Sequence, residues 1–279
     1  MNSKHLNNRF DFASYDIASE AVEIKRDHGI RVKRMNVSGL NIEQLDILNP
    51  DNIYNKRVGR YSLIDNSKDM SIESLKEAFK TALNSFIKKW HLKKSSALLL
   101  GIGNKNYAPD ALGPEVSSRI NASLDKKRKK ILSLSPGVFA QTGIDCASLA
   151  KAVIKEEDID YVIAIDSLVT HKLNRLNKVI QISDGGIAPG SGIGNRRKEL
   201  SQDYLKVPVI SIGVATVVNK ASIIKDFIDS YNIDRASYRM LSEGISDLKK
   251  DEYFTSNDID YKVEILADVI SSVINDLYK

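Results

Sequence analysis

The chain has 279 residues, 42% of them apolar and 28% charged, with a formal net charge of +5. This composition is typical of a water-soluble globular protein, and a slightly basic solvated surface explains the mild charge, so we expect no direct binding of nucleic acid. Cys146 is the only cysteine, which excludes an internal disulfide and a cysteine metal cage and favours a reducing, cytoplasmic compartment. No apolar run reaches the roughly 20 residues that span a bilayer, so we expect no membrane association.

The first 90 residues contain three local signals. Residues 1–20 are polar without a clear period and are interpreted as a tail. Residues 30–37 alternate apolar and charged side chains, which is typical of a half-exposed strand. Ser71 begins a predicted helix, whose buried face is marked by apolar residues at spacings of three and four: Leu75, Phe79, Leu83, Phe86 and Trp90.

A strand, a loop and a helix follow, and they organise the rest of the chain. The apolar run 97–100 ends in Gly101 and Gly103, a polar loop follows, and Pro114 opens a helical pattern. This is the unit from which parallel α/β sheets are built. Chemistry in such sheets collects in the loops beyond the carboxyl ends of the strands, and Asp110 lies in this loop.

A second apolar run, 160–166, ends on a carboxylate, Asp166. Neighbouring parallel strands bring their carboxyl ends to one edge of the sheet, so we expect Asp110 and Asp166 to converge. Two carboxylates in one cleft are the minimum for acid–base hydrolysis of a peptide or glycosidic bond.

Each aspartate also has a structural alternative. Asp110 precedes a helix and is a candidate N-cap. Asp166 is a candidate cap or a partner for Lys172 or Arg175. The histidines are scattered, but His171, five residues after Asp166, leaves a histidine-based triad open.

A glycine-rich loop occupies 184–195, after a predicted strand over 178–182. It is compatible with a phosphate cradle, but no Gly-Lys-Ser/Thr follows at P-loop spacing. In a peptidase, such a loop lets an extended substrate backbone approach and supplies N–H groups to a developing oxyanion. The predicted substrate-binding residues are Gly185, Gly186, Gly190, Ser191, Gly192 and Gly194.

Seven short motifs occur along the chain in one order. They are Gly101-Ile-Gly-Asn104, Pro109-Asp-Ala-Leu-Gly-Pro114, Pro136-Gly-Val138, Gln141-Thr-Gly-Ile144, Ala164-Ile-Asp166, Pro189–Lys198 and Gly213–Val218. In this order the motifs resemble the germination proteases of spore-forming bacteria, endopeptidases that degrade small acid-soluble spore proteins.

The resemblance implies a single α/β domain with a mostly parallel central sheet flanked by helices, similar to hydrogenase-maturation endopeptidases. It implies catalysis by Asp110 and Asp166, matched through Pro-Asp-Ala-Leu-Gly-Pro and Ala-Ile-Asp, with no cofactor and no metal. It further implies a homotetramer in the cytoplasm of the forespore and spore core, with small acid-soluble spore proteins as substrates.

Members of this family are made as zymogens that remove their own N-terminal segment. Residues 15–21, Tyr-Asp-Ile-Ala-Ser-Glu-Ala, resemble the Glu-Phe/Ile-Ala-Ser-Glu site at which the family cuts its substrates. We therefore predict self-cleavage between Asp16 and Ile17. That places a propeptide-like segment at 1–16 and the peptidase domain at 17–279.

Two other functions compete with this interpretation. One is a related maturation endopeptidase in which the carboxylates bind a divalent metal ion. The other is a non-catalytic α/β protein that binds nucleotides through its glycine-rich loops.

Overall fold

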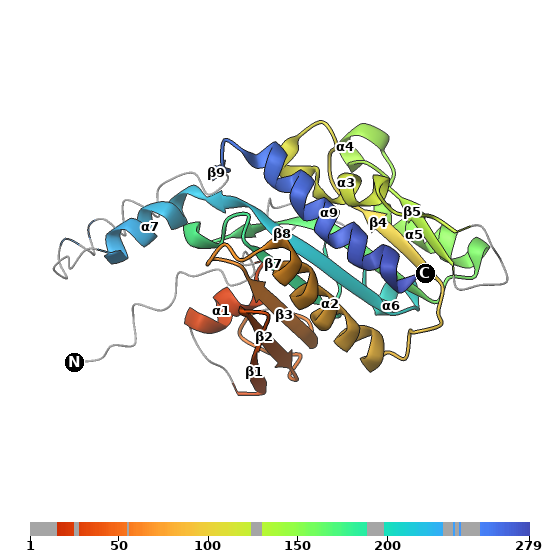
Figure 1. The fold of residues 1–279 in the computed structure, drawn as a ribbon, viewed down its shortest axis with the longest axis horizontal. Helices are drawn as coiled ribbons and strands as arrows, with labels where there is room; N and C mark the ends of the chain where they lie inside the picture. Colours follow the sequence, from red (N-terminus) through yellow and green to blue (C-terminus); the bar gives the residue numbers. More distant parts are fainter. Residues whose placement is uncertain are drawn as a thin grey trace.

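A computed structural model describes residues 16–24, 28–54, 56–123, 130–188, 198–230, 237, 240 and 252–279. Helices lie on both sides of one central sheet (Figure 1). The strands are β1 (Ile30–Val37), β2 (Leu40–Ile47), β3 (Gly59–Asp65), β4 (Ala97–Gly101), β5 (Ile131–Leu134), β6 (Tyr161–Thr170), β7 (Val179–Ser183), β8 (Val209–Asn219) and β9 (Tyr253–Phe254).

The α-helices are α1 (Ala18–Ile24), α2 (Ile72–Lys89), α3 (Leu112–Ser118), α4 (Phe139–Thr142), α5 (Cys146–Glu157), α6 (Gln202–Leu205), α7 (Lys220–Ser230) and α9 (Ile259–Leu277). Among the described residues, two short 3₁₀ helices, η2 (Ala108–Asp110) and η3 (Leu173–Arg175), lie in the connections. In the part of the chain described by the structure, no helix is long and apolar enough to cross a membrane.

The strands pair in the order β1-β2-β3-β7-β8-β6-β4-β5, with β9 beside β8. Strands β8, β6, β4 and β5 are parallel, and the other pairings are antiparallel. The α/β fold is therefore confirmed, but the sheet is mixed, and the expected parallel arrangement holds for only one half. The eight residues between β6 and β7 are too few for a crossover helix, so β7 runs back antiparallel to β8.

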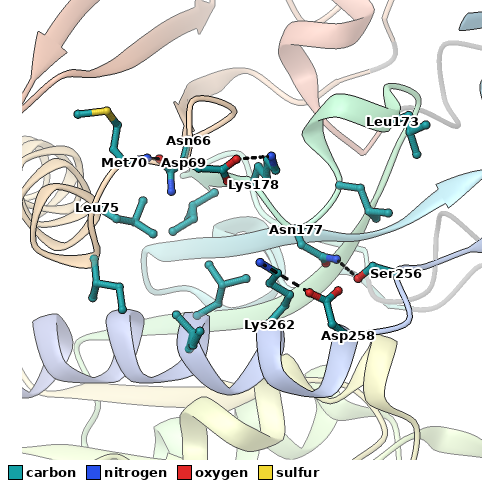
Figure 2. Close-up of a pocket in the computed structure, with 15 residues that line it drawn as sticks. Asn66, Asp69, Met70, Leu75, Leu173, Asn177, Lys178, Ser256, Asp258 and Lys262 are labelled. Atoms are coloured by element: carbon teal, nitrogen blue, oxygen red, sulfur yellow. Dashed lines mark hydrogen bonds and ion pairs between the residues drawn. The ribbon is translucent and has the colours of Figure 1, made fainter.

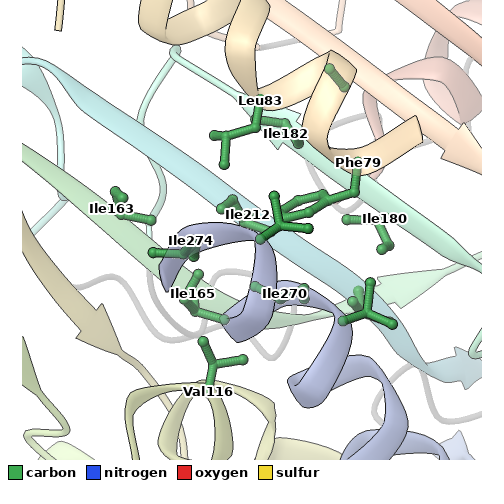
Figure 3. Close-up of a cluster of buried hydrophobic side chains, with 14 of the residues drawn as sticks. Phe79, Leu83, Val116, Ile163, Ile165, Ile180, Ile182, Ile212, Ile270 and Ile274 are labelled. Carbon is green, nitrogen blue, oxygen red and sulfur yellow. The ribbon is translucent and has the colours of Figure 1, made fainter. Parts of the chain in front are cut away.

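One face of the sheet is covered by α2, α3 and α9, and the main core lies there. The predicted helix after Ser71 is confirmed: Ser71 caps α2 by accepting the N–H of Ser74 at 3.2 Å. Figure 3 shows Phe79 and Leu83 of α2 and Ile270 and Ile274 of α9 over isoleucines of β6, β7 and β8.

The other face carries three smaller groups of apolar side chains, one of which surrounds Ile17. Helices α5 and α6 cover Leu98, Leu100, Val162 and Ala164 of β4 and β6. Helix α1 packs on β2 and β3 at the other end of the sheet (Figure 1). The interpretation of residues 1–20 as a tail is therefore wrong for 17–20, since these residues are buried.

Candidate active site

Asp166 lies within β6, on the sheet face opposite the main core. Ile163 and Ile165 face α2, α3 and α9, so the alternation of a strand turns Ala164 and Asp166 to the other side. The side chain of Asp166 is buried, with 7% of its surface exposed, and its Oδ1 accepts the N–H of Ser167 at 2.9 Å. The apolar strand thus places one carboxylate in a largely dry environment.

Close backbone packing positions Asp110 at the neighbouring strand end. A Cβ on Gly101 would lie 2.2 Å from the main-chain oxygen of Gly113, so only glycine lets β4 and α3 approach in this way. Gly103 adopts φ +123° and packs against the main chain of Asp110 in η2. These glycines serve the packing of the loop against the strand.

The N-cap alternative for Asp110 is wrong. The N-cap of α3 is Ala111, and no side chain caps this helix. The Oδ2 of Asp110 instead accepts the main-chain N–H of Asn104 at 2.9 Å. The carboxylate is thereby fixed at the carboxyl end of β4, where the N–H of Ile102 donates to the oxygen of Ile165, the residue before Asp166.

The two carboxyl groups interact electrostatically. The pKa of Asp166 is raised well above its usual value, first by burial and then by the negative charges of Asp110 and Asp16, while the Ser167 N–H opposes the rise. The structure therefore brings together the two residues nominated from separate strand ends, and Asp16 with them. Lys172 and Arg175 pair instead with glutamates of α1, which removes the ion-pair alternative for Asp166.

Asp16 and Ile17, the predicted cleavage site, lie on the same sheet face as Asp166. The Oδ2 of Asp16 accepts the N–H of Val169 at 2.9 Å, just after an irregularity in the pairing of β6 with β8. Burial raises the pKa of Asp16, partly offset by the charge of Lys56, by the Val169 N–H and by His171. The side chain of Ile17 is completely buried.

The described part of the glycine-rich loop does not lie against the aspartates. Gly186 has φ +84° and packs on the main chain of Leu200, while Gly185 packs on the Tyr61 ring. Both glycines follow Ser183, the last residue of β7. Ser183 pairs with Ser211 of β8, which lies two residues before Gly213, the partner of Asp166 in β6. Gly190, Ser191, Gly192 and Gly194 lie outside the described residues, so the role of this loop stays a prediction.

His171 contacts a serine but forms no accessible nucleophilic pair. Its Nδ1 lies 2.7 Å from the Oγ of Ser222 in α7. Ser222 is buried, so its hydroxyl is not presented to a substrate. In the described ranges, no group of three histidine, cysteine, aspartate or glutamate side chains is arranged to hold a metal ion.

A pocket of about 290 Å³ lies elsewhere, between the N-terminal ends of α2 and α9 (Figure 2). Its charged side chains form ion pairs, Lys178 with Asp69 at 2.7 Å and Lys262 with Asp258 at 3.8 Å. Neither Asp110 nor Asp166 lines it. We therefore place the candidate active site on the opposite face of the sheet, at the aspartates.

The sequence did not indicate that three side chains interact with the N-terminal segment: Lys56, Arg175 and Gln181. Lys56 is close enough for its charge to act on Asp16. Gln181 and Arg175 bind residues 16–23 from more than 150 positions along the chain. No local pattern marks them, because their partners are defined only by the folded chain.

Comparison with known proteins identifies the family. Its profile, described as "Germination protease", matches residues 13–236. A germination protease of Clostridium acetobutylicum is 32% identical and aligns over 94% of this chain and 86% of its own length. One of Bacillus subtilis is 35% identical over 75% of this chain but only 59% of its own length.

A solved structure gives a more distant likeness. The [NiFe] hydrogenase maturation protease HycI of Thermococcus kodakarensis overlaps 68% of this chain and 98% of its own, with 15% identity and a TM-score of 0.40. At that distance the likeness says nothing about activity. The profile and the curated relatives decide the assignment: this chain belongs to the germination protease family.

Proposed function

We propose that this chain is an endopeptidase in which Asp110 and Asp166 activate water to hydrolyse a peptide bond. Membership of the germination protease family makes the chain a protease. One observation carries the two-aspartate mechanism: the buried carboxyl of Asp166 has a raised pKa and interacts with the charge of Asp110. Such a pair holds one proton and one negative charge, which is what acid–base hydrolysis needs.

The proposed reaction forms no covalent intermediate. Asp110, as carboxylate, takes a proton from a water molecule while the water oxygen attacks the peptide carbonyl carbon. Asp166, whose burial favours the protonated form, gives its proton to the leaving nitrogen as the C–N bond breaks. The pair has then exchanged roles, and proton exchange with solvent restores the starting state. Burial, which favours the protonated form of Asp166, supports this assignment.

The finer parts of the proposal come from the family. The substrates are small acid-soluble spore proteins cut at Glu-Phe/Ile-Ala-Ser-Glu sites in the germinating spore, and the chain is a homotetrameric zymogen in the forespore and spore core. Self-cleavage between Asp16 and Ile17 is supported by the electrostatic influence of Asp16 on Asp166. The new chain would begin at Ile17.

The test is cleavage of a synthetic peptide containing Glu-Ile-Ala-Ser-Glu, followed by mass spectrometry. We expect one cut before the isoleucine, and we expect Asp110→Asn and Asp166→Asn each to lower kcat by at least about 100-fold, the usual contribution of acid–base catalysis. Asp203→Asn, at an exposed aspartate, is the matched control and keeps full activity. Turnover near the wild-type rate by either site variant removes that residue from the mechanism.

A further inference from the structure

The chain fills a groove beside the aspartates with its own residues 16–20. The groove lies on the sheet face that carries Asp166. Asp166 is opposite Gly213 of β8, and Gly213 is opposite Gln181 of β7, so all three belong to one row. At about 4.8 Å per strand, Gln181 stands about 10 Å from Asp166, with only a glycine between them. The side chain of Leu168 in β6 lies over Gly213, and Ile17 packs against Leu168.

Ile17 occupies an apolar pocket in this groove. Its side chain is fully buried among four apolar side chains from four strands: Leu63, Leu168, Val179 and Ala215. Removing such a side chain from water stabilises the bound segment through the hydrophobic effect. The pocket therefore recognises a branched apolar residue next to the aspartates.

The side chain of Gln181 holds the main chain on both sides of Ile17. Its Oε1 accepts the N–H of Ala18 at 2.8 Å, and its Nε2 donates to the main-chain oxygen of Asp16 at 3.1 Å. These two bonds resemble strand pairing and depend on no particular side chain in the peptide. They fix the backbone that leads to the bond between Asp16 and Ile17.

The third contact is a buried site for a carboxylate, filled by Glu20. The Oε1 of Glu20 accepts the hydroxyl of Thr170 at 2.6 Å, and its Oε2 accepts the N–H of His171 at 2.8 Å. The guanidinium of Arg175 lies 3.3 Å from Oε1, and both side chains of this ion pair are buried. Because a buried charge is costly without such partners, the site is selective for an anion.

The spacing of the two pockets matches a helical turn. The N–H of Glu20 donates to the main-chain oxygen of Ile17, and α1 begins at Ala18. Residues three apart in a helical turn project to the same side, so Ile17 and Glu20 both reach the sheet. The residue before Ile17, Asp16, is close enough to Asp166 to affect its pKa.

From this geometry we infer that the groove is the substrate-binding groove. The pocket of Ile17 receives the apolar residue after the cut bond of the proposed cleavage sequence, and the site of Glu20 receives the glutamate three positions later. Arg175 determines specificity for that carboxylate, and Gln181 positions the backbone. Residues 16–20 compete with a substrate for the same groove. This inference rests on the proposed endopeptidase activity.

The test compares three peptides on the full-length chain: Glu-Ile-Ala-Ser-Glu and its versions ending in Gln or Lys. We expect kcat/KM to fall about 10- to 100-fold with Gln and further with Lys, since the buried site loses a charged hydrogen-bond partner. In Arg175→Gln, the preference for Glu over Gln should fall to within about threefold, and Arg175→Lys should restore part of it. Equal cleavage of all three peptides by the wild-type chain overturns the inference.

Arg119→Gln is the matched control, because Arg119 forms its ion pairs with Glu115 and Asp268 on α3 and α9. We expect it to keep the wild-type preference. Thermal unfolding shows whether each variant is folded. The comparison of peptides on the wild-type chain does not depend on any variant.

A binding experiment separates this inference from the proposed function. A fluorescent Ile-Ala-Ser-Glu peptide is titrated into the wild-type chain and into Glu20→Gln, whose own segment is held less tightly. We expect at least tenfold tighter binding to Glu20→Gln, and at least tenfold weaker binding to either protein when the peptide ends in Gln. Glu-dependent binding without any cleavage refutes the endopeptidase but keeps the groove. Cleavage and binding that do not depend on the terminal Glu refute the substrate-binding role of the groove but not the endopeptidase activity.

Discussion

At the scale of single residues, the site depends on carboxyl groups in an unfavourable environment. Asp166 is buried within a β-strand and near two other acids, so its charged form is disfavoured. Burial of such a carboxyl lowers stability at pH values where the carboxyl ionises in the unfolded chain. A raised pKa favours the protonated form, so the property that lowers stability is the one that the proposed chemistry uses.

The pH dependence of stability follows from the sign of this shift. The pKa of Asp166 in the folded chain lies above its unfolded value, so between the two the folded state binds more protons, and stability falls as pH rises. Asp166→Asn removes this loss. We therefore expect the variant to be more stable than the wild type at pH 7, with a difference that shrinks as pH falls toward 4.

Urea unfolding of both proteins at pH 4, 5, 6 and 7 measures this difference. Asp203→Asn, at an exposed residue, should follow the wild type throughout. A constant difference between Asp166→Asn and the wild type across this range would contradict the assignment of a raised pKa.

At the scale of elements, helix α2 shows how a local pattern becomes a packed face. Its apolar residues recur every three or four positions, and the structure buries those on the predicted face, Leu75, Phe79, Leu83 and Phe86. The face packs on β7 and β8 beside α9 (Figure 3). This helix therefore holds together the half of the sheet to which Gln181 and Gly213 belong.

Phe79→Ala tests that role. The side chain is fully buried, so truncation leaves a cavity, and we expect the free energy of unfolding to fall by about 3–5 kcal/mol. Lys80→Ala, at the exposed neighbouring position, should change it by less than about 0.5 kcal/mol. Chemical denaturation gives both values, and a loss below about 1 kcal/mol for Phe79→Ala would show that the core is not packed as described.

At the scale of the whole molecule, the N-terminal segment links folding to activity. Residues 17–24 complete the apolar groups on β2, β3 and β6, so they belong to the folded domain. The bond before them is the one that we propose the chain cuts. A cut there would release the residues that precede Ile17, after which residues 17–20 would have to give way before a substrate could enter the same groove.

Mass spectrometry of the purified chain over time tests self-cleavage. We expect the wild type to lose residues 1–16 and to gain Ile17 as its N-terminus, while Asp166→Asn stays full length because it lacks the proton donor. Asp203→Asn should be processed like the wild type. A wild-type chain that cleaves the peptide but keeps its N-terminus shows that self-cleavage is not part of its activity.

The metal-dependent alternative is tested on the same active chain. Our mechanism uses only carboxyl groups and water, so peptide cleavage should be unchanged after exhaustive dialysis against a chelator. Loss of activity that returns on adding a divalent ion would instead support a metal-dependent endopeptidase. A control protease of known metal dependence, treated in parallel, shows that the chelation was complete.

The sequence by itself determined the α/β class and helix α2, and it nominated Asp110 and Asp166, although β6 continues past Asp166 to Thr170. Each depends on a local pattern, such as an apolar run that stops at Gly101 or at Asp166. Only the tertiary structure decided that β7 runs antiparallel, that residues 17–20 lie in the sheet groove and that Arg175 binds Glu20. These features join positions as many as 165 residues apart, and they are stabilised by burial and charge pairing, which no local pattern encodes.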